Sequence, residues 1–235
     1  MAVAVTGLLL CINSPAAVVV VDGQLNDLIA AAANPDTGAI ATESGADAEN
    51  NGFDITSSYS YFDPVLDVFY LGFETAGPVG DSCTPTGGGI CGILNTPNFQ
   101  TNESYGFQLD VNSDASYEVG LVLVGDGGSG VGPDTATSMT APGGVVIDWA
   151  VSEADDGVEF SVGGLLASGI LPQFSPVNPV SVTLRFTGGG APNPGPEDEA
   201  FHTTILTPVP AAAWLLGSAL LGLGGIAARR QQRQS

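Results

Sequence analysis

The stretch Val180-Ser-Val-Thr-Leu-Arg-Phe186 alternates apolar and polar side chains without interruption. Successive side chains of a β-strand point to opposite faces of a sheet, so this period of two predicts a strand with one buried and one exposed face. The same alternation recurs in residues 105–111, 145–151 and 158–162. In the second of these, Trp149 falls on the apolar face and is predicted to lie in the core rather than to form a ligand platform.

Four further segments complete the predicted strands. Residues 66–73 and 119–124 are nearly continuous apolar runs, as expected for central strands. Residues 55–61 and 18–21 are predicted as two further strands. Loops rich in Gly, Pro, Asn and Asp separate these segments, and only 25–33 looks helical between the two ends of the chain. The sequence therefore predicts an all-β fold, an antiparallel β-sandwich of the jelly-roll or immunoglobulin-like kind.

The N-terminal residues 1–17 are typical of a secretory signal helix. An apolar run ends in Asn13-Ser-Pro-Ala-Ala17, and small residues of this kind precede signal cleavage. The usual positive charge at the start is missing, so either the true start lies upstream or the signal is atypical. Cys11 follows Leu10, which is too large for the position before a lipidated cysteine. A plain signal is therefore favoured over a lipoprotein signal.

The C-terminal residues 207–235 predict a membrane anchor. The run 211–228 is uncharged and at the lower edge of membrane-spanning length. The positive-inside rule places the basic residues after it in the cytoplasm. The predicted anchor residues are an interfacial tryptophan, two small helix-packing residues and the arginines: Trp214, Gly217, Gly222, Arg229, Arg230 and Arg233.

The order of elements in this segment resembles the PEP-CTERM sorting signals, in their Val-Pro-Leu-Pro-Ala variant. Pro208, Val209, Pro210 and Ala211 match the Pro-x-Pro-Ala core, and a glycine-dotted apolar helix and an arginine cluster follow. The resemblance implies an exosortase-type membrane protease as partner in a Gram-negative host. It implies transit through the inner membrane to the cell surface or the extracellular biofilm matrix. The alternative is an ordinary tail anchor that is never cut.

The ectodomain, residues 18–206, also resembles carbohydrate-binding sandwiches of the family 9 or DOMON-like type. The opening Val21-Asp-Gly-Gln-Leu-Asn-Asp27 and the paired strands that contain Asp63-Pro-Val-Leu-Asp67 carry this resemblance. It implies polysaccharide binding. The pair of tryptophans that stacks on sugars in such domains is missing, because Trp149 is the only tryptophan in the ectodomain.

The chain is strongly acidic, with 25 Asp and Glu against four arginines and no lysine. Arg185 is the only basic residue between positions 22 and 199. Such a surface repels nucleic acid, whose phosphates are contacted by Lys and Arg. It attracts cations, above all Ca²⁺, which prefers carboxylate and carbonyl oxygens. A high net charge also keeps a protein soluble, so solubility alone is the alternative reading.

A candidate calcium loop follows one of the predicted strands. Asp110, Asn112 and Asp114 place oxygen ligands at alternate positions, as calcium loops do. The loop departs from an EF-hand, because Ala115 stands where the turn glycine belongs and Leu121 where the bidentate glutamate belongs. Asn and Asp also favour plain turns, so a turn without metal is the other interpretation.

Two cysteines, Cys83 and Cys91, flank a glycine-rich stretch. In an exported protein this pattern predicts a disulfide, whose small loop would contribute about 2 kcal/mol of stability. A zinc site is disfavoured, because two thiols with no histidine nearby fall short of four ligands.

Catalysis finds little support in the sequence. There is no lysine and no Gly-x-Ser-x-Gly elbow, and His202 is the single histidine. Three hypotheses follow: a non-catalytic surface or matrix protein that binds polysaccharide, a calcium-stabilised membrane-anchored adhesin, and a secreted glycan-active enzyme. The last would need two carboxylates facing each other across a cleft, about 5–10 Å apart.

Overall fold

The computed structural model describes residues 18–43, 52–77, 79, 104–124, 135–152, 157–172, 179–189 and 198–206. Within these ranges no helix has the length and apolar character needed to cross a membrane. The predicted signal helix 1–17, the Cys83–Cys91 pair and the sorting segment 207–235 with its helix 211–228 all lie outside the described residues.

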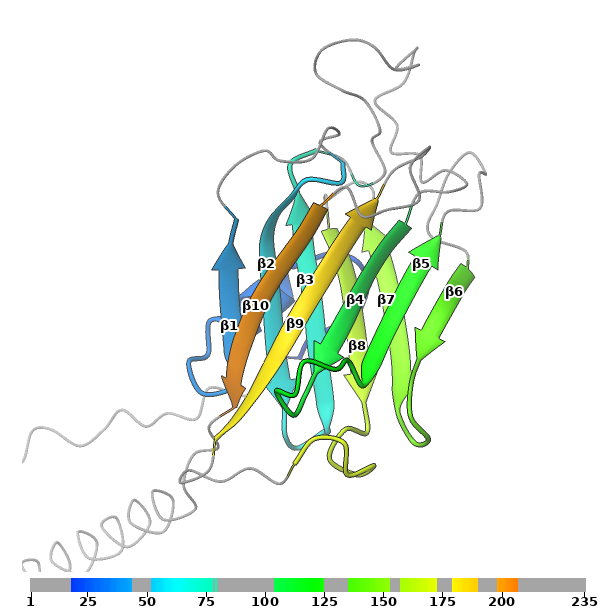
Figure 1. The fold of residues 1–235 in the computed structure, drawn as a ribbon. Coiled ribbons are helices and arrows are strands. Elements are labelled where there is room, and N and C mark those ends of the chain that lie inside the picture. Colours follow the sequence, from blue (N-terminus) through cyan, green and yellow to red (C-terminus); the bar gives the residue numbers. More distant parts are fainter. Residues whose placement is uncertain are drawn as a thin grey trace, which may run out of the picture.

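Two five-stranded antiparallel sheets form the fold (Figure 1). The first sheet has the order β1 (Gly38–Thr42), β2 (Ile55–Asp63), β3 (Val68–Thr75), β8 (Gly157–Gly163), β7 (Val146–Ser152). The second has the order β10 (Asp198–Leu206), β9 (Val180–Gly189), β4 (Ser104–Asp110), β5 (Val119–Val124), β6 (Thr135–Thr140). This arrangement is consistent with the predicted β-sandwich.

The core lies between the two sheets and is rich in aromatic rings. Phe73 on β3 is at its centre, with ring centroids 5.4 Å from Phe186 and 5.7 Å from Tyr105. Phe107 and Phe160 meet across the sandwich at 4.8 Å. The period of two correctly assigned the inward face of the alternating segments that contain Tyr105, Phe107, Phe160 and Phe186. Phe73 instead ends the continuous apolar run 66–73.

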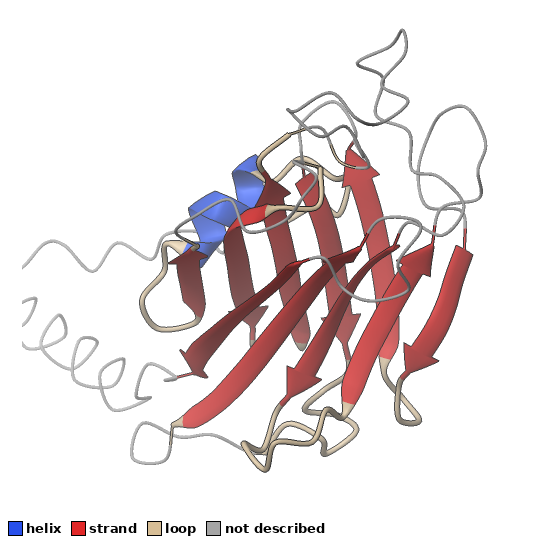
Figure 2. Cartoon of the chain, turned by 45° about the horizontal axis from the view of Figure 1, so that its top comes forward, coloured by secondary structure: helices blue, strands red, loops and turns tan. Residues whose placement is uncertain are grey.

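The only helix of the described residues, α1 (Asn26–Ala32), packs on the outer face of the first sheet (Figure 2). Its buried Leu28 belongs to a second apolar cluster with Tyr59, Tyr61 and Tyr70. Gly72 permits this contact, because a Cβ atom there would lie 2.8 Å from the Leu28 side chain. The first sheet is therefore covered on both faces near β2 and β3.

Three strands, β1, β6 and β10, were not predicted, and residues 18–21, predicted as a strand, lie outside any sheet. The pattern of β10 is mixed, since polar His202 and Thr204 face inward together with apolar Ala200 and Leu206, while Phe201 and Ile205 are exposed. Residues 18–21 pass over the outer face instead, where the backbone N–H of Val20 donates to Asp27 of α1.

One side of the sandwich has an open edge in each sheet. Among the described strands, β1 pairs only with β2, and β10 pairs only with β9. The two unpaired edges lie alongside each other, and we call the line between them the seam (Figure 1).

Candidate metal centre

The hairpin between β4 and β5 carries the predicted calcium loop. Asp110 is the last residue of β4, and Glu118 directly precedes β5. The backbone N–H of Glu118 donates to the carbonyl of Leu109 at 2.9 Å, which closes the base of the hairpin. Because strand pairing fixes both ends of the loop, the carboxylates of Asp110 and Glu118 are held close together.

The Asp110 side chain organises the loop from inside. It is 5 % exposed, and its Oδ1 accepts the backbone N–H groups of Asn112 at 3.2 Å and Ser113 at 2.6 Å. Its Oδ2 accepts the N–H of Ala115 at 2.9 Å. These bonds wrap the backbone around the carboxylate, as Asp commonly does in turns.

Two residues of the loop adopt left-handed backbone conformations. Ser113 has φ 61° and Ala115 has φ 65°. Non-glycine residues are uncommon there. Ala115 thus has the conformation that a calcium loop requires of its turn glycine, although it carries a Cβ atom. The structure therefore accommodates the departure from the EF-hand pattern noted in the sequence.

Three carboxylates converge at this loop. One ligand oxygen from each of Asp110, Asp114 and Glu118 lies within 4.8 Å of the other two. Asp110 is buried, Glu118 is partly buried and Asp114 is exposed. A carboxylate oxygen that accepts one backbone hydrogen bond keeps a second lone pair, so the triad retains capacity to hold a metal ion.

The third predicted ligand, Asn112, is not one of the three converging carboxylates but supports them. Its Nδ2 donates to Glu118 at 2.9 Å, and its Oδ1 accepts the N–H of Asp114 at 2.9 Å.

Glu118 was not predicted as a ligand, because the sequence was compared with the twelve-residue EF-hand spacing. The signal was present, since Glu118 continues the alternate positions that Asp110, Asn112 and Asp114 begin.

A buried cluster of three hydroxyls and one imidazole lies between β2 and β10. Ser58 Oγ is 2.7 Å from His202 Nδ1, and Ser60 Oγ is 2.9 Å from His202 Nε2. Ser60 is also hydrogen-bonded to Thr204. We call this set the imidazole cluster.

The imidazole cluster has the contacts of a Ser–His pair, but hydroxyl groups bond to both ring nitrogens of His202 and no carboxylate does. Burial lowers the pKa of His202 to about 4, so at neutral pH the ring is uncharged and a weak base. General bases work best with a pKa near the operating pH. The group that orients the ring is the hydroxyl of Ser60, whereas a carboxylate would stabilise the imidazolium that forms in catalysis.

A buried carboxylate on the opposite face of the first sheet is another polar group that the sequence pattern did not indicate. Glu159 on β8 is 1 % exposed, and its Oε2 accepts the backbone N–H groups of Gly23 at 2.8 Å and Asp22 at 3.1 Å. Its Oε1 is buried without a hydrogen-bond partner. Burial raises the pKa of Glu159 to about 7, and the charges of Asp27 and Asp22 add to this effect.

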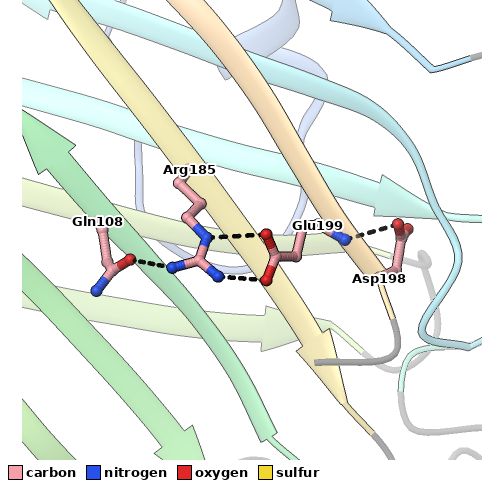
Figure 3. Close-up of polar contacts among 4 residues, drawn as sticks. All are labelled: Gln108, Arg185, Asp198 and Glu199. Carbon is pink, nitrogen blue, oxygen red and sulfur yellow. Dashed lines mark hydrogen bonds and ion pairs between the residues drawn. The ribbon is translucent and has the colours of Figure 1, made fainter. Parts of the chain in front are cut away.

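Arg185 lies on the outer face of the second sheet and is held by its neighbours (Figure 3). Its guanidinium donates to both carboxylate oxygens of Glu199 on β10, and Nη1 donates to Gln108 Oε1 at 2.8 Å. The guanidinium also lies 5.8 Å from the ring centroid of Phe201. The charge of Arg185 is therefore already engaged by a carboxylate.

Comparison with known proteins identifies no family. No protein-family model matches the chain, and no curated protein matches it either. One solved structure, on pH-induced modulation of Streptococcus parasanguinis adhesion by Fap1 fimbriae, is 13 % identical over 68 % of this chain and 72 % of that one. Its TM-score is 0.19, so the match carries no argument about fold or function.

Proposed function

We propose that this chain is an exported, non-catalytic protein of the cell surface or extracellular matrix of a Gram-negative bacterium, stabilised by Ca²⁺. The convergence of Asp110, Asp114 and Glu118 carries the calcium part of the proposal. The resemblance of residues 207–235 to a PEP-CTERM sorting signal carries the export part. An exosortase-type protease in the membrane is the proposed processing partner.

Calcium suits the loop better than other common metals. The converging ligands are all oxygens, which hard cations prefer, and the described triad contains no histidine or cysteine that would favour zinc. A site at a hairpin end also ties β4 and β5 together, so bound metal stabilises the folded state over the unfolded one. The alternative, a calcium-stabilised adhesin that stays anchored in the membrane, differs from this proposal only in that the C-terminal tail is not cleaved.

The non-catalytic part rests on the polar groups that the fold brings together. His202 is a weak base among hydroxyls, and Glu159 is sealed beneath the segment that contains Gly23. Neither arrangement offers an exposed acid and base at neutral pH. A glycosidase would need two facing carboxylates in a cleft. Among the described residues, β1, β2 and β10 line a pocket at the seam, and Glu43 contributes the one carboxylate of its lining.

Intact mass and cell fractionation test the export proposal. In a host with the matching protease we expect the mature protein to lack everything after about Pro210. Changing Pro208→Ala and Pro210→Ala together should leave the tail on and the protein in the inner membrane, because the proline motif marks the cleavage region. Pro172→Ala, in an exposed loop of the sandwich, is the matched control and should be processed normally. If both the original chain and the double variant keep the tail, the segment is a simple anchor.

A further inference from the structure

Large apolar side chains are exposed at the end of the sandwich where β10 finishes. The strands β2, β6 and β10 all run toward this end (Figure 1). Single exposed apolar residues need no explanation, whereas several on one surface mark a site of protein or membrane interaction. We call this surface the apolar end; among the described residues, its exposed large apolar side chains are Val65, Leu66, Met139, Val146 and Ile205.

The turn between β2 and β3 holds two of these side chains outward. Val65 is 87 % exposed and Leu66 is 63 % exposed. Asp63 Oδ1 accepts the backbone N–H groups of both, at 2.8 Å and 3.0 Å. On the other side of the turn, the Asp67 carboxylate accepts two N–H groups of the loop that follows β8. Turns favour Gly, Pro, Asn, Asp and Ser, so the turn itself does not require two large apolar residues at its tip.

Hydrogen bonds across the seam fix the position of this turn relative to the end of β10. Ser60 on β2 bonds to Thr204 on β10, and the residues two positions earlier on each strand are also hydrogen-bonded. The two strands therefore advance in step toward the same end. Leu206, the last residue of β10, follows Thr204 by two positions, whereas β2 continues for three positions beyond Ser60 before the turn begins. The turn therefore reaches at least as far as the point where the chain leaves the sandwich.

The predicted membrane anchor follows closely in the sequence. The uncharged run 211–228 begins five positions after Leu206. An extended chain spans at most about 3.6 Å per residue, so this run begins within about 18 Å of the end of β10. If the run crosses the membrane, as the proposed function holds, the apolar end lies next to the bilayer surface.

The charge of the protein restricts the kind of lipid. The chain carries a formal charge of −21, and the exposed Asp114 lies in the β4–β5 loop at this same end. Anionic headgroups would repel such a surface, whereas zwitterionic headgroups would not. Apolar side chains beside a bilayer gain free energy by entering the boundary between headgroups and acyl chains.

We infer that the apolar end of the sandwich rests on the lipid bilayer that holds the tail, with Val65 and Leu66 inserted among the headgroups of zwitterionic lipids. The inference rests on the proposed anchor and adds a second membrane contact, made by the folded domain itself. This contact orients the domain and keeps residues 208–210 at the bilayer surface, where a membrane protease would meet them.

Methyl NMR of the full-length protein in phosphatidylcholine nanodiscs, without added calcium, tests this contact. Two paramagnetic agents are compared, a gadolinium chelate dissolved in the water and a nitroxide attached to the lipid acyl chains. The nitroxide should broaden the methyl signals of Val65 and Leu66, and the chelate should not. Ile40, 47 % exposed on β1, should respond mainly to the chelate. If the chelate broadens Val65 and Leu66 as strongly as Ile40, the inference is wrong.

A matched pair of variants tests whether the apolar side chains cause the contact. Val65→Asp should open Leu66 to the chelate, because an unpaired charge is costly to bury in lipid. Ile40→Asp introduces the same charge away from the apolar end and should leave Leu66 protected. Both positions are exposed, so both variants should melt as the original chain does. Unchanged protection of Leu66 in Val65→Asp would overturn the inference.

The same spectra distinguish this inference from its alternatives. Shielding of Val65 and Leu66 from both agents would mean that a protein surface, such as a second copy of this chain, covers them, and would overturn the lipid contact. A chain that stays outside the nanodiscs would contradict the proposed anchor and this inference with it. A chain that enters the nanodiscs while Val65 and Leu66 stay open to the chelate would contradict this inference alone.

Discussion

Replacing Glu159 with glutamine should make the protein progressively more stable, relative to the original chain, as the pH rises from 5 to 8. The pKa of Glu159 is raised from 4.5 to about 7 in the folded protein by burial. The folded state therefore binds a proton that the unfolded state has released, so stability is lost as the pH rises through 7. Glutamine never ionises and avoids this loss.

The expected change in the stability difference across this range is about 2–3 kcal/mol, since each pKa unit corresponds to 1.36 kcal/mol. Urea denaturation at pH 5, 6.5 and 8 measures it, and any pH-independent cost of the amide cancels in the comparison. Asp148→Asn, which removes an exposed carboxylate on β7, serves as the control. Its free energy of unfolding should change with pH by the same amount as that of the original chain. If the free energy of unfolding of Glu159→Gln changed with pH as that of the original chain does, Glu159 would ionise normally and the prediction would be wrong.

The opposite pH dependence is expected for His202→Gln. The pKa of His202 is lowered from 6.5 to about 4 by burial in the imidazole cluster. The unfolded state takes up a proton below pH 6.5 while the folded state does not, so the original chain loses stability as the pH falls. Relative to it, the variant should gain about 2 kcal/mol between pH 7.5 and pH 5.

A direct titration accompanies this prediction, because the chain has a single histidine. The imidazole C–H resonance in a proton NMR spectrum should not shift between pH 8 and pH 5 in the folded protein. A midpoint near 6.5 would contradict a buried, uncharged ring. Between pH 5 and 6.5 the contributions of Glu159 and His202 run in opposite directions, so each single variant should have a steeper pH dependence than the original chain.

The sandwich was predictable because its strands alternate locally. Val182, Leu184 and Phe186 face the core along β9 as the pattern required. Strand β10 escaped prediction because its inward residues include His202 and Thr204, while Phe201 and Ile205 face outward. A polar inner face is satisfied only by partners on another strand, here Ser58 and Ser60, and hydrophobic periodicity cannot reveal such a pairing.

The candidate metal loop was partly predictable for the same reason. Asp110, Asn112 and Asp114 are close in sequence, so their convergence follows from a single turn. Glu159 differs, since its partner Gly23 is 136 residues away and nothing local indicates that a backbone segment will cover it. The pocket at the seam likewise depends on β1 and β10, which are about 160 residues apart in the sequence.

Calorimetric titration of the metal-free protein with Ca²⁺ tests the calcium site most directly. We expect one site, lost or weakened about tenfold or more in Asp114→Asn, because removing one ligand charge lowers calcium affinity. Asp114 is exposed, so this variant keeps the fold, and Asp148→Asn again makes the same change at an exposed position elsewhere. Ala115→Gly should bind at least as tightly, because glycine adopts the left-handed conformation freely.

The account predicts saturable binding in the original chain, in Asp148→Asn and in Ala115→Gly, with a large loss in Asp114→Asn. Bound calcium should also raise the melting temperature, since it binds the folded state alone. Binding that is equal in Asp114→Asn and in the original chain would place the ion away from Asp110, Asp114 and Glu118. No binding at millimolar Ca²⁺ would leave the loop as a plain turn and contradict the calcium-stabilised sandwich.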